Sequence, residues 1–374
     1  MAQDRYERSE KWLERALLIT PLGTQTRSKR FCEGAYPTTL AGGLGSHVWD
    51  VDKNEYIDWV LGLGAVGLGH GYVQSIRSGS YSLPHRVEVE YAEALLPALK
   101  WPEQVRFVKT GSEATEGAMM MARRATGRQL ILSVGYHGWH FIHQPSEILV
   151  DVHWGSLEAI LAAETAPVAA VIVEPHRTLI PPPRYWTGLR DLCDRMGAML
   201  IVDEMVTGFR WALGGATEYW NIKPDLACYG KAMANGYPLA CIVGKREIME
   251  EAEIVSSTFG GEVASLAMAR LVLEVYQKEP VIEVLWARGS ALQRGFKAER
   301  FECVGYPCHP TIRALGGDME RFLVETAVRG VLFHPKPFNV SYSHTELDVE
   351  RSLEAAWEAG KESTRREIVE CTGE

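Results

Sequence analysis

Between residues 169 and 203 the chain reads Ala-Ala-Val-Ile-Val (169–173), then a stretch typical of a helix (184–196), and then Met-Leu-Ile-Val-Asp (199–203). Short runs that are continuously apolar and β-branched are typical of strands buried on both faces of a parallel sheet. The same alternation extends outward from about residue 104 to 244, with further apolar runs at 105–108, 130–132, 226–228 and 240–243. The pattern predicts an α/β layer with a mostly parallel central sheet and helices on both faces.

The flanking segments differ from this layer. The first 60 residues predict a helix, an extended arm and a hairpin-like piece over 48–58. Beyond Gly261 the sequence predicts helices at 263–278, 282–297, 318–329 and from about 347, with strands near 301–306, 311–315, 331–333 and 339–343. We therefore expect three parts: an N-terminal arm and hairpin segment (1–60) that packs with the small domain, a large α/β domain (61–262), and a small C-terminal α+β domain (263–374).

Composition excludes several classes of protein. The 374 residues carry 48 Asp and Glu against 39 Lys and Arg, and this net charge of −9 argues against nucleic acid or an anionic membrane as the main partner. The longest clean apolar run, 166–173, is far shorter than the roughly 20 residues of a membrane span. The N-terminus is too charged for a secretory signal, and the seven cysteines form no C-x-x-C pair. We expect a reduced, soluble, cytoplasmic protein.

Two motifs suggest functions that their context does not support. Residues 62–67 match the dinucleotide fingerprint G-x-G-x-x-G, but no helix start follows them, so a glycine-rich loop is favoured. His137, His140 and His143 have a spacing that would suit metal ligands on one side of a helix. Gly138 and Pro145 argue against a regular helix there, and we expect no metal site.

A phosphate-binding turn is the first feature that indicates chemistry. Thr110-Gly111-Ser112-Glu113-Ala114 lies between a predicted strand and a predicted helix. Glycine lets a ligand approach the backbone, and a helix N-terminus offers free N–H groups and a positive dipole end. Alone the signal is weak, because many strand–helix turns contain Gly-Ser.

Three further side chains complete a chemical set. Asp203 ends a buried strand at the edge where open α/β sheets bind ligands. Lys231 lies among small and apolar residues, where desolvation favours the neutral, nucleophilic amine. Tyr136 follows another strand and offers a ring that can stack on a planar ligand. A helix-capping role for Asp203 and a solvent-reaching lysine remain open from these residues alone. Together with the phosphate turn, however, the set describes pyridoxal phosphate (PLP) chemistry.

The chain resembles the class III aminotransferases of PLP fold type I, and within them the glutamate-1-semialdehyde aminomutase-like branch. The most specific matches are residues 203–210, 224–239 and 257–261, and the similarity extends from about Pro21 to Thr345. The resemblance implies a fold type I PLP-dependent transferase with pyridoxal 5′-phosphate as its cofactor.

The resemblance also assigns roles to residues. Lys231 would hold PLP as a Schiff base and move the proton between substrate and cofactor, and Asp203 would keep the pyridine nitrogen protonated. Tyr136 is similar to the residue stacked on one ring face, and Met205 stands where the family usually has a valine that packs the other face.

Three further residues would bind the cofactor phosphate. Gly111 and Ser112 match the family's phosphate turn. Thr258 resembles the threonine that reaches the phosphate of the neighbouring subunit, which implies a homodimer with shared active sites.

The chain departs from the family pattern at three candidate substrate residues. Lys29 replaces a substrate-carboxylate arginine and loses its bidentate fork. Leu63 replaces a tryptophan and removes an aromatic wall, and Glu262 replaces a common asparagine and adds negative charge near the mouth. The chain is also short between His70 and Ser82, and again between Gly138 and Asp151.

The sequence therefore favours an aminotransferase that moves an amino group from an amine or amino acid donor to a carbonyl acceptor through Lys231. The alternative is a glutamate-1-semialdehyde-type 2,1-aminomutase, which uses the same cofactor and lysine but retains its intermediate. A PLP-binding protein without turnover is a third hypothesis, against which the intact Lys231, Asp203 and Tyr136 argue.

Overall fold

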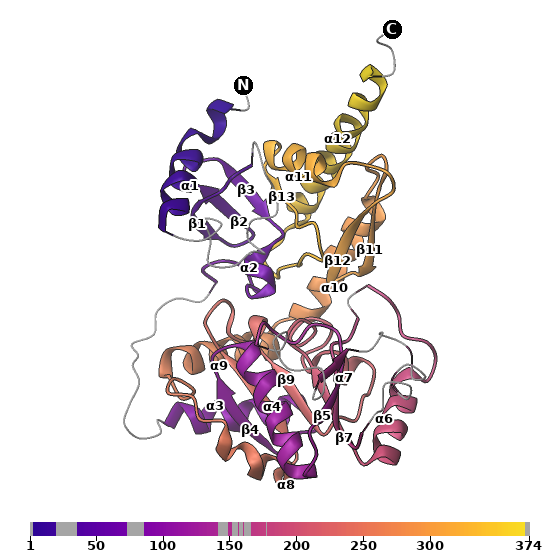
Figure 1. Cartoon of the computed structure of the whole chain (residues 1–374). Helices are drawn as coiled ribbons and strands as arrows, with labels where there is room; N and C mark the ends of the chain where they lie inside the picture. Colours follow the sequence, from indigo (N-terminus) through magenta and orange to yellow (C-terminus); the bar gives the residue numbers. More distant parts are fainter. Residues whose placement is uncertain are drawn as a thin grey trace. The chain divides into compact units, whose positions relative to one another are not determined.

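The chain forms two compact units (Figure 1). The computed structural model describes residues 3–19, 36–72, 86–140, 149–151, 156, 160, 166–176 and 178–370. Unit 1 combines residues 1–72 with 283–374, and unit 2 comprises residues 73–282. Lys29 lies outside the described residues, as does most of the stretch 156–164, where the sequence also predicts a helix.

Unit 2 is built on a seven-stranded sheet. In spatial order its strands are β4 (Gln104–Val108), β10 (Ala240–Gly244), β9 (Leu226–Tyr229), β8 (Met199–Asp203), β7 (Val168–Val173), β5 (Leu130–Val134) and β6 (Leu149–Asp151). β10 is antiparallel to both of its neighbours, and the other neighbouring pairs are parallel. The predicted α/β architecture with a mostly parallel sheet is confirmed, and β6 is a strand that the sequence pattern did not predict.

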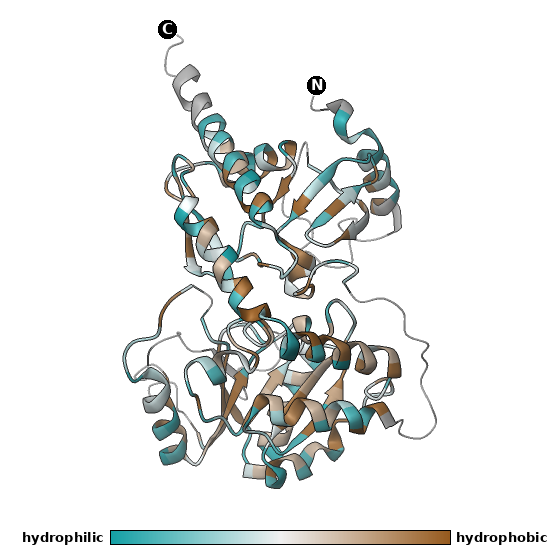
Figure 2. Ribbon diagram, turned by 180° about the vertical axis from the view of Figure 1, so that it is seen from behind, coloured by the Kyte–Doolittle hydropathy of each residue, from teal (hydrophilic) through white to brown (hydrophobic). Residues whose placement is uncertain are grey.

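Helices and short turns surround this sheet. They are α3 (Arg86–Leu99), α4 (Gly111–Thr126), α6 (Tyr185–Met196), α7 (Gly215–Tyr219), η5 (Lys231–Ala234), α8 (Arg246–Met249), η6 (Glu250–Ile254) and α9 (Val263–Lys278). α4 buries Ala114, Ala118 and Ala122 in a core shared with the apolar side chains of the strands. A Cβ at Gly117 would lie 2.8 Å from the Ile242 side chain, so the glycine lets α4 approach the sheet closely. Figure 2 shows the apolar residues concentrated along the strands of this sheet.

Unit 1 has a smaller four-stranded sheet. Its strands are β1 (Leu40–Leu44), β2 (His47–Asp50), β3 (Glu55–Asp58) and β13 (Val331–Leu332), and β13 lies parallel to β3. The other elements are η1 (Gln3–Tyr6), α1 (Glu7–Ile19), α2 (Leu61–Gly64), α10 (Val281–Gly295), the hairpin of β11 (Phe301–Tyr306) and β12 (His309–Ala314), α11 (Met319–Val328) and α12 (Glu346–Glu370). The Trp59 ring packs on Phe333, Phe338 and His344, and its Nε1 donates to Ser352 Oγ at 2.9 Å. This aromatic cluster forms a buried core within unit 1.

Two details differ from the expectations. Residues 339–343 form no strand, because their backbone groups bond to loops, as Asn339 N does to Trp59 O at 2.9 Å. The unit boundaries also lie elsewhere than 60 and 262: residues 61–72 group with unit 1, and α9 groups with unit 2 because it packs on α3 and η5. No helix within the described ranges is long and apolar enough to cross a membrane.

Candidate active site

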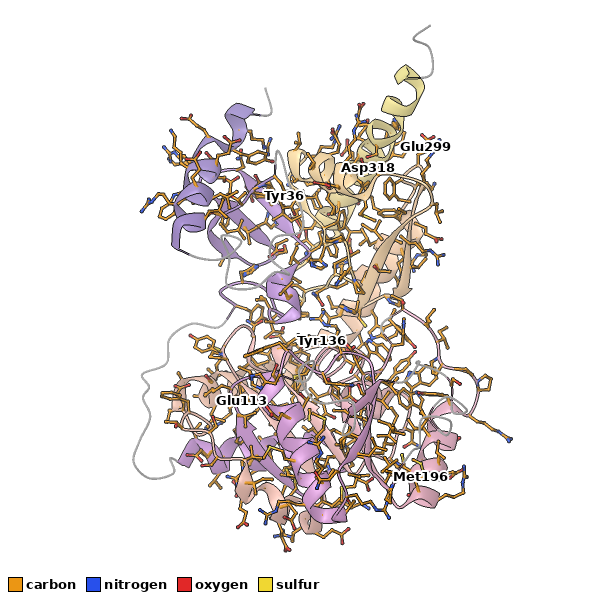
Figure 3. All side chains as sticks on the ribbon, viewed as in Figure 1. Tyr36, Glu113, Tyr136, Met196, Glu299 and Asp318 are labelled. Carbon is orange, nitrogen blue, oxygen red and sulfur yellow. The ribbon has the colours of Figure 1, made fainter. Side chains whose placement is uncertain are left out.

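The predicted chemical residues of unit 2 lie at one edge of the seven-stranded sheet. Thr110, Tyr136 and Asp203 each stand at or just beyond the carboxyl end of a strand, and Lys231 follows the end of β9. β4 and β9 are both antiparallel to β10 and therefore run in the same direction, together with β8, β7 and β5. Figure 3 shows Tyr136 and Met196, which precedes β8, at opposite edges of unit 2. The fold thus brings the predicted residues to the edge where α/β sheets bind ligands.

The turn into α4 has the features of an anion site. Thr110 Oγ1 accepts from Glu113 N at 3.2 Å, and Glu113 Oε2 accepts from Thr110 N at 2.9 Å, which forms a capping box. Among the described residues no acceptor meets the N–H groups of Gly111 and Ser112. A phosphate at a helix N-terminus accepts from such groups. The geometry therefore fits the predicted phosphate turn.

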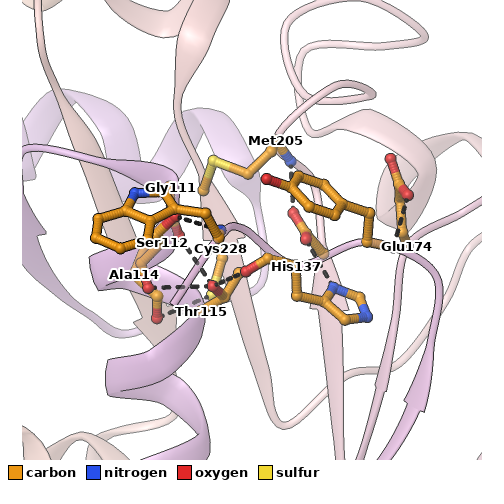
Figure 4. A network of polar contacts seen from close by, with 11 residues as sticks. Gly111, Ser112, Ala114, Thr115, His137, Glu174, Met205 and Cys228 are labelled. Atoms are coloured by element: carbon orange, nitrogen blue, oxygen red, sulfur yellow. Dashed lines mark hydrogen bonds and ion pairs between the residues drawn. The ribbon is translucent and has the colours of Figure 1, made fainter. Parts of the chain in front are cut away.

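The loop after β5 lies directly on this helix end. Gly138 has φ +96°, and a Cβ there would lie 2.2 Å from Ser112 Oγ. Thr115 Oγ1 donates to His137 O at 2.6 Å, and Trp139 N donates to Ser112 Oγ at 3.2 Å. Figure 4 shows this network around Ser112, Thr115 and His137. The loop and the first turn of α4 are therefore held together as one structure.

Asp203 is a buried carboxylate with two partners. It is 3% exposed, and its Oδ1 accepts from Met205 N at 3.0 Å. Its Oδ2 lies 2.8 Å from Nδ1 of His137, whose side chain is also buried. A buried charge requires such partners. The sequence suggests His137 only as a metal ligand and does not indicate this contact. That His137 is buried while the neighbouring Tyr136 is exposed becomes visible only in the structure.

Lys231 adopts a backbone conformation that is unusual for a lysine. Its φ is +48°, in the left-handed region, at the first residue of η5. Strained non-glycine residues cluster at functional sites. Met205 lies close by: a Cβ on Gly111 would be 2.8 Å from its Sδ, and a Cβ on Gly230 would be 2.7 Å from it. The thioether therefore lies between the phosphate turn and the residue before Lys231.

Tyr136 presents its ring at the same edge. The side chain is 58% exposed, and its backbone N–H donates to Glu174 Oε2 at 3.2 Å. Glu174 follows the end of β7, and a Cβ on Gly135 would lie 2.8 Å from its Cβ. Glu174, which the sequence analysis did not single out, thus fixes the backbone that carries the ring.

The remaining predicted residues have different surroundings. Thr258 is exposed in unit 2, and Leu63 lies in unit 1 with φ +60°. Glu262 is the N-cap of α9: its carboxylate accepts from Ala264 N at 2.6 Å and from Ser265 N at 3.1 Å. Lys109 Nζ also lies 3.2 Å from Glu262 Oε2. The Glu262 charge is therefore already balanced by a helix end and a lysine.

We expect Glu262→Ala to reduce the free energy of unfolding by about 1 kcal/mol at neutral pH, because it removes a helix cap. Burial would raise the pKa of Glu262, but hydrogen bonds from the Ser265 hydroxyl and from the amides of Ala264 and Ser265 outweigh it and lower that pKa. The stabilisation is therefore complete above the unfolded value of 4.5 and is lost as the pH falls through the lower folded value. Urea unfolding of both proteins at neutral and acidic pH tests this; an equal difference at both would contradict it.

Comparison with known proteins identifies the family. A family model described as aminotransferase class-III matches residues 145–316. A glutamate-1-semialdehyde 2,1-aminomutase from Chloroflexus aggregans (strain MD-66 / DSM 9485) is 30% identical over 432 residues, covering 96% of this chain and 99% of the relative. The chain belongs to the class-III aminotransferase family. The resemblance inferred from the sequence is confirmed.

Further similar proteins agree with this family and with its fold. A 3-aminobutyryl-CoA aminotransferase from Cloacimonas acidaminovorans (strain Evry) is 32% identical and covers 78% of this chain and 77% of its own. The PLP internal aldimine form of the Sphingopyxis sp. MTA144 FumI protein superimposes with a TM-score of 0.90 at 27% identity, covering 97% of this chain and 98% of its own. A glutamate-1-semialdehyde-aminomutase from Pseudomonas aeruginosa PAO1 has a TM-score of 0.85 at 18% identity, covering 96% of each chain, which shows the fold alone. The predicted fold type I architecture is confirmed.

Proposed function

We propose that this class-III aminotransferase uses pyridoxal 5′-phosphate to move an amino group from an amine or amino acid to a carbonyl acceptor. The observation that carries the proposal is the arrangement at one sheet edge, where the buried Asp203 carboxylate, the strained Lys231 and the N-terminal amides of α4 all follow the carboxyl ends of strands. The carboxylate, the lysine and the amides each match one part of the cofactor in charge and chemistry. When bound, PLP supplies an electron-withdrawing ring that stabilises negative charge on the substrate carbon.

Individual residues of this chain would have separate roles toward the cofactor and the substrate. The amides of Gly111 and Ser112 would bind the phosphate, and the exposed ring of Tyr136 would stack on the pyridine. Asp203 holds a proton on the pyridine nitrogen, and His137 at 2.8 Å keeps that carboxylate oriented. Lys231 would hold the cofactor through its amine, and the free amine would move a proton to and from the substrate carbon.

Intermolecular transfer is favoured over the aminomutase reaction. An aminomutase must retain its intermediate, which requires a closed site. The Chloroflexus aggregans aminomutase aligns over 432 residues, more than the 374 of this chain, so it carries segments that this chain lacks. The sequence is short after Gly138, and Leu63 replaces an aromatic wall. These features favour an open site that releases its keto product.

We expect glutamate-1-semialdehyde, supplied without a separate acceptor, to convert the cofactor to its amine form and to yield little 5-aminolevulinate. The measurement combines product analysis with cofactor absorbance. A parallel reaction with an added keto acid should restore the aldehyde form of the cofactor and sustain turnover. Efficient conversion without any acceptor, with little loss of cofactor to the amine form, would establish the aminomutase instead.

We also propose a homodimer with shared active sites. Thr258 is exposed and is followed by Phe259, which is 55% exposed, so both are available to a neighbouring subunit. Thr258→Ala should weaken PLP retention by about tenfold, as expected for the loss of one hydrogen bond to a charged group, with little change in thermal stability. Equilibrium dialysis of the cofactor and sedimentation would measure this. A fully active monomer would contradict the shared site.

A further inference from the structure

A cavity of about 500 Å³ lies within unit 1, and all of its lining residues belong to this unit. Strands β2, β3 and the start of β13 line one side of it, and α12 lines the other (Figure 1). None of the residues assigned to the candidate active site takes part in the lining. The volume suits a small molecule.

The floor of the cavity is apolar and begins with a row of side chains across the sheet. His47 of β2 lies opposite Ile57 of β3, and Ile57 lies opposite Val331 of β13. Side chains directly opposite each other on neighbouring strands project from the same face. Ile57 and Val331 are buried, as is Ala355, which lines the cavity from α12. The cavity therefore offers aliphatic surface to an apolar group.

The start of α12 is fixed to this row of side chains. Asp348 Oδ1 lies 2.9 Å from His47 Nε2, and Asp348 Oδ2 accepts from Ser46 Oγ at 2.8 Å. On the other side of the imidazole, His47 Nδ1 lies 2.9 Å from Glu55 Oε1. These contacts hold the helix against the sheet, so the cavity is preformed. A preformed site loses less conformational entropy when it binds a ligand.

The α12 side of the cavity carries two charged groups of opposite sign. Arg351 and Glu354 share a helix face with Ala355, since residues three and four apart lie on the same side. Both are exposed, and neither has an ion-pair or hydrogen-bond partner among the described residues. In contrast, Arg329, which also lines the cavity, donates to Glu325 Oε2 at 2.6 Å. Arg351 and Glu354 are therefore available to a ligand.

The mixture of charges selects the kind of ligand. A phosphate or a dicarboxylate would meet the carboxylates of Glu55 and Glu354. A polyamine would meet the guanidinium groups of Arg329 and Arg351. A molecule that carries one charge of each sign avoids both conflicts. A guanidinium fork matches a carboxylate, and a carboxylate matches an ammonium group.

We propose that this cavity binds a zwitterionic α-amino acid with an apolar side chain. Arg351 pairs with its carboxylate, Glu354 pairs with its ammonium group, and the aliphatic floor receives its side chain. The site is thus a second amino acid site, in unit 1. The proposal does not depend on the proposed PLP-dependent function, because it uses neither the cofactor nor any residue assigned to it.

Calorimetric titration of the full-length protein with L-leucine and two analogues tests the need for both charges. 4-Methylpentanoate lacks only the ammonium group of leucine, and 3-methylbutylamine lacks only its carboxylate. Leucine should bind at least about tenfold more tightly than either analogue, because each analogue loses one charge-assisted contact. No binding at millimolar leucine, or equal affinity for an analogue, would overturn the proposal.

Hydrogen–deuterium exchange locates the bound leucine. Peptides that cover residues 47–57 and 351–358 should exchange more slowly when leucine is present, since a ligand stabilises the folded state that binds it. Protection confined to the peptide that contains Lys231 would place leucine at the candidate active site and would overturn the second site. That result would leave the proposed PLP chemistry intact.

Two substitutions separate the two charges. Arg351→Gln should weaken leucine binding by about tenfold or more and leave 3-methylbutylamine unaffected. Glu354→Gln should weaken leucine binding to a similar extent and leave 4-methylpentanoate unaffected. Glu350→Gln is the matched control, since Glu350 is exposed on α12 outside the lining and should keep the wild-type affinity. Wild-type leucine affinity in both Arg351→Gln and Glu354→Gln would overturn the proposal.

Discussion

Lys231→Ala is expected to lower turnover by roughly 10⁴-fold or more and to abolish the visible absorbance of lysine-bound cofactor. The substitution removes both the amine that binds PLP and the group that carries the proton. Alanine meets the same left-handed backbone strain as lysine at φ +48°, so the fold should be little affected. Loss of function with an unchanged unfolding transition would separate chemistry from stability.

Two measurements make this prediction specific to Lys231. Borohydride reduction should fix the cofactor on the peptide that contains Lys231 in the wild-type protein and on no peptide of the variant. Lys223→Ala is the control, because Lys223 is exposed in the same unit and its ammonium group donates to Asn221 Oδ1 at 2.7 Å, away from the sheet edge that carries Lys231. Near-normal turnover in Lys231→Ala would show that the lysine has been assigned wrongly.

The strands and helices of unit 2 could be predicted because their signals are local. Each apolar run between 105 and 243 became a strand within about two residues, and the helix predicted at 263–278 has those bounds in the structure. The direction of β10 could not be predicted. Whether a strand pairs parallel or antiparallel depends on where the rest of the sheet lies, and residues 240–243 are as apolar as a parallel strand would be.

Site residues could be predicted from the sequence where the residue type itself implies the chemistry. They could not be predicted where the role of a residue depends on a distant partner. Lys231, Asp203 and the Gly111-Ser112 turn could be identified because each lies at or just after the end of a predicted strand. The contact of His137 with Asp203 joins positions 66 residues apart, and no local pattern contains it. Glu262 shows the same limit, since Ser, Thr, Asp and Asn are the preferred N-caps and a glutamate before a helical stretch does not indicate the cap that the structure shows.

Glu204 illustrates how burial separates neighbouring carboxylates. It follows Asp203 directly, yet it turns away and accepts from Ala216 N at 2.9 Å and Thr217 N at 2.6 Å. Burial raises the pKa of Glu204, and the hydrogen bonds that it accepts offset part of that effect. A carboxylate that caps α7 from inside the protein has a structural role, whereas Asp203 is at the ligand-binding edge.

Asp203→Asn is expected to lower turnover by about 10³-fold, corresponding to roughly 4 kcal/mol of transition-state stabilisation. The amide has nearly the same shape, and its oxygen can still accept from Met205 N, so the fold should persist. It carries no charge, however, and therefore cannot hold a proton on the pyridine nitrogen. The amide group is also a donor, so it requires the other tautomer of His137, whose Nδ1 is 2.8 Å from Asp203 Oδ2.

Two further variants separate this electrostatic effect from packing. His137→Gln leaves the Asp203 charge in place and removes only its orienting partner, so we expect a loss of about tenfold, close to the cost of one hydrogen bond to a charged group. Asp225→Asn is the matched control, since Asp225 accepts from Leu200 N and Arg190 at 2.7 Å in a structural role at the start of β9. That control should lower stability and leave the rate constant unchanged. Turnover above about a tenth of the wild-type value in Asp203→Asn would contradict the prediction. The loss of one ordinary hydrogen bond explains a decrease of that size, so the proton on the pyridine nitrogen would not depend on the Asp203 carboxylate.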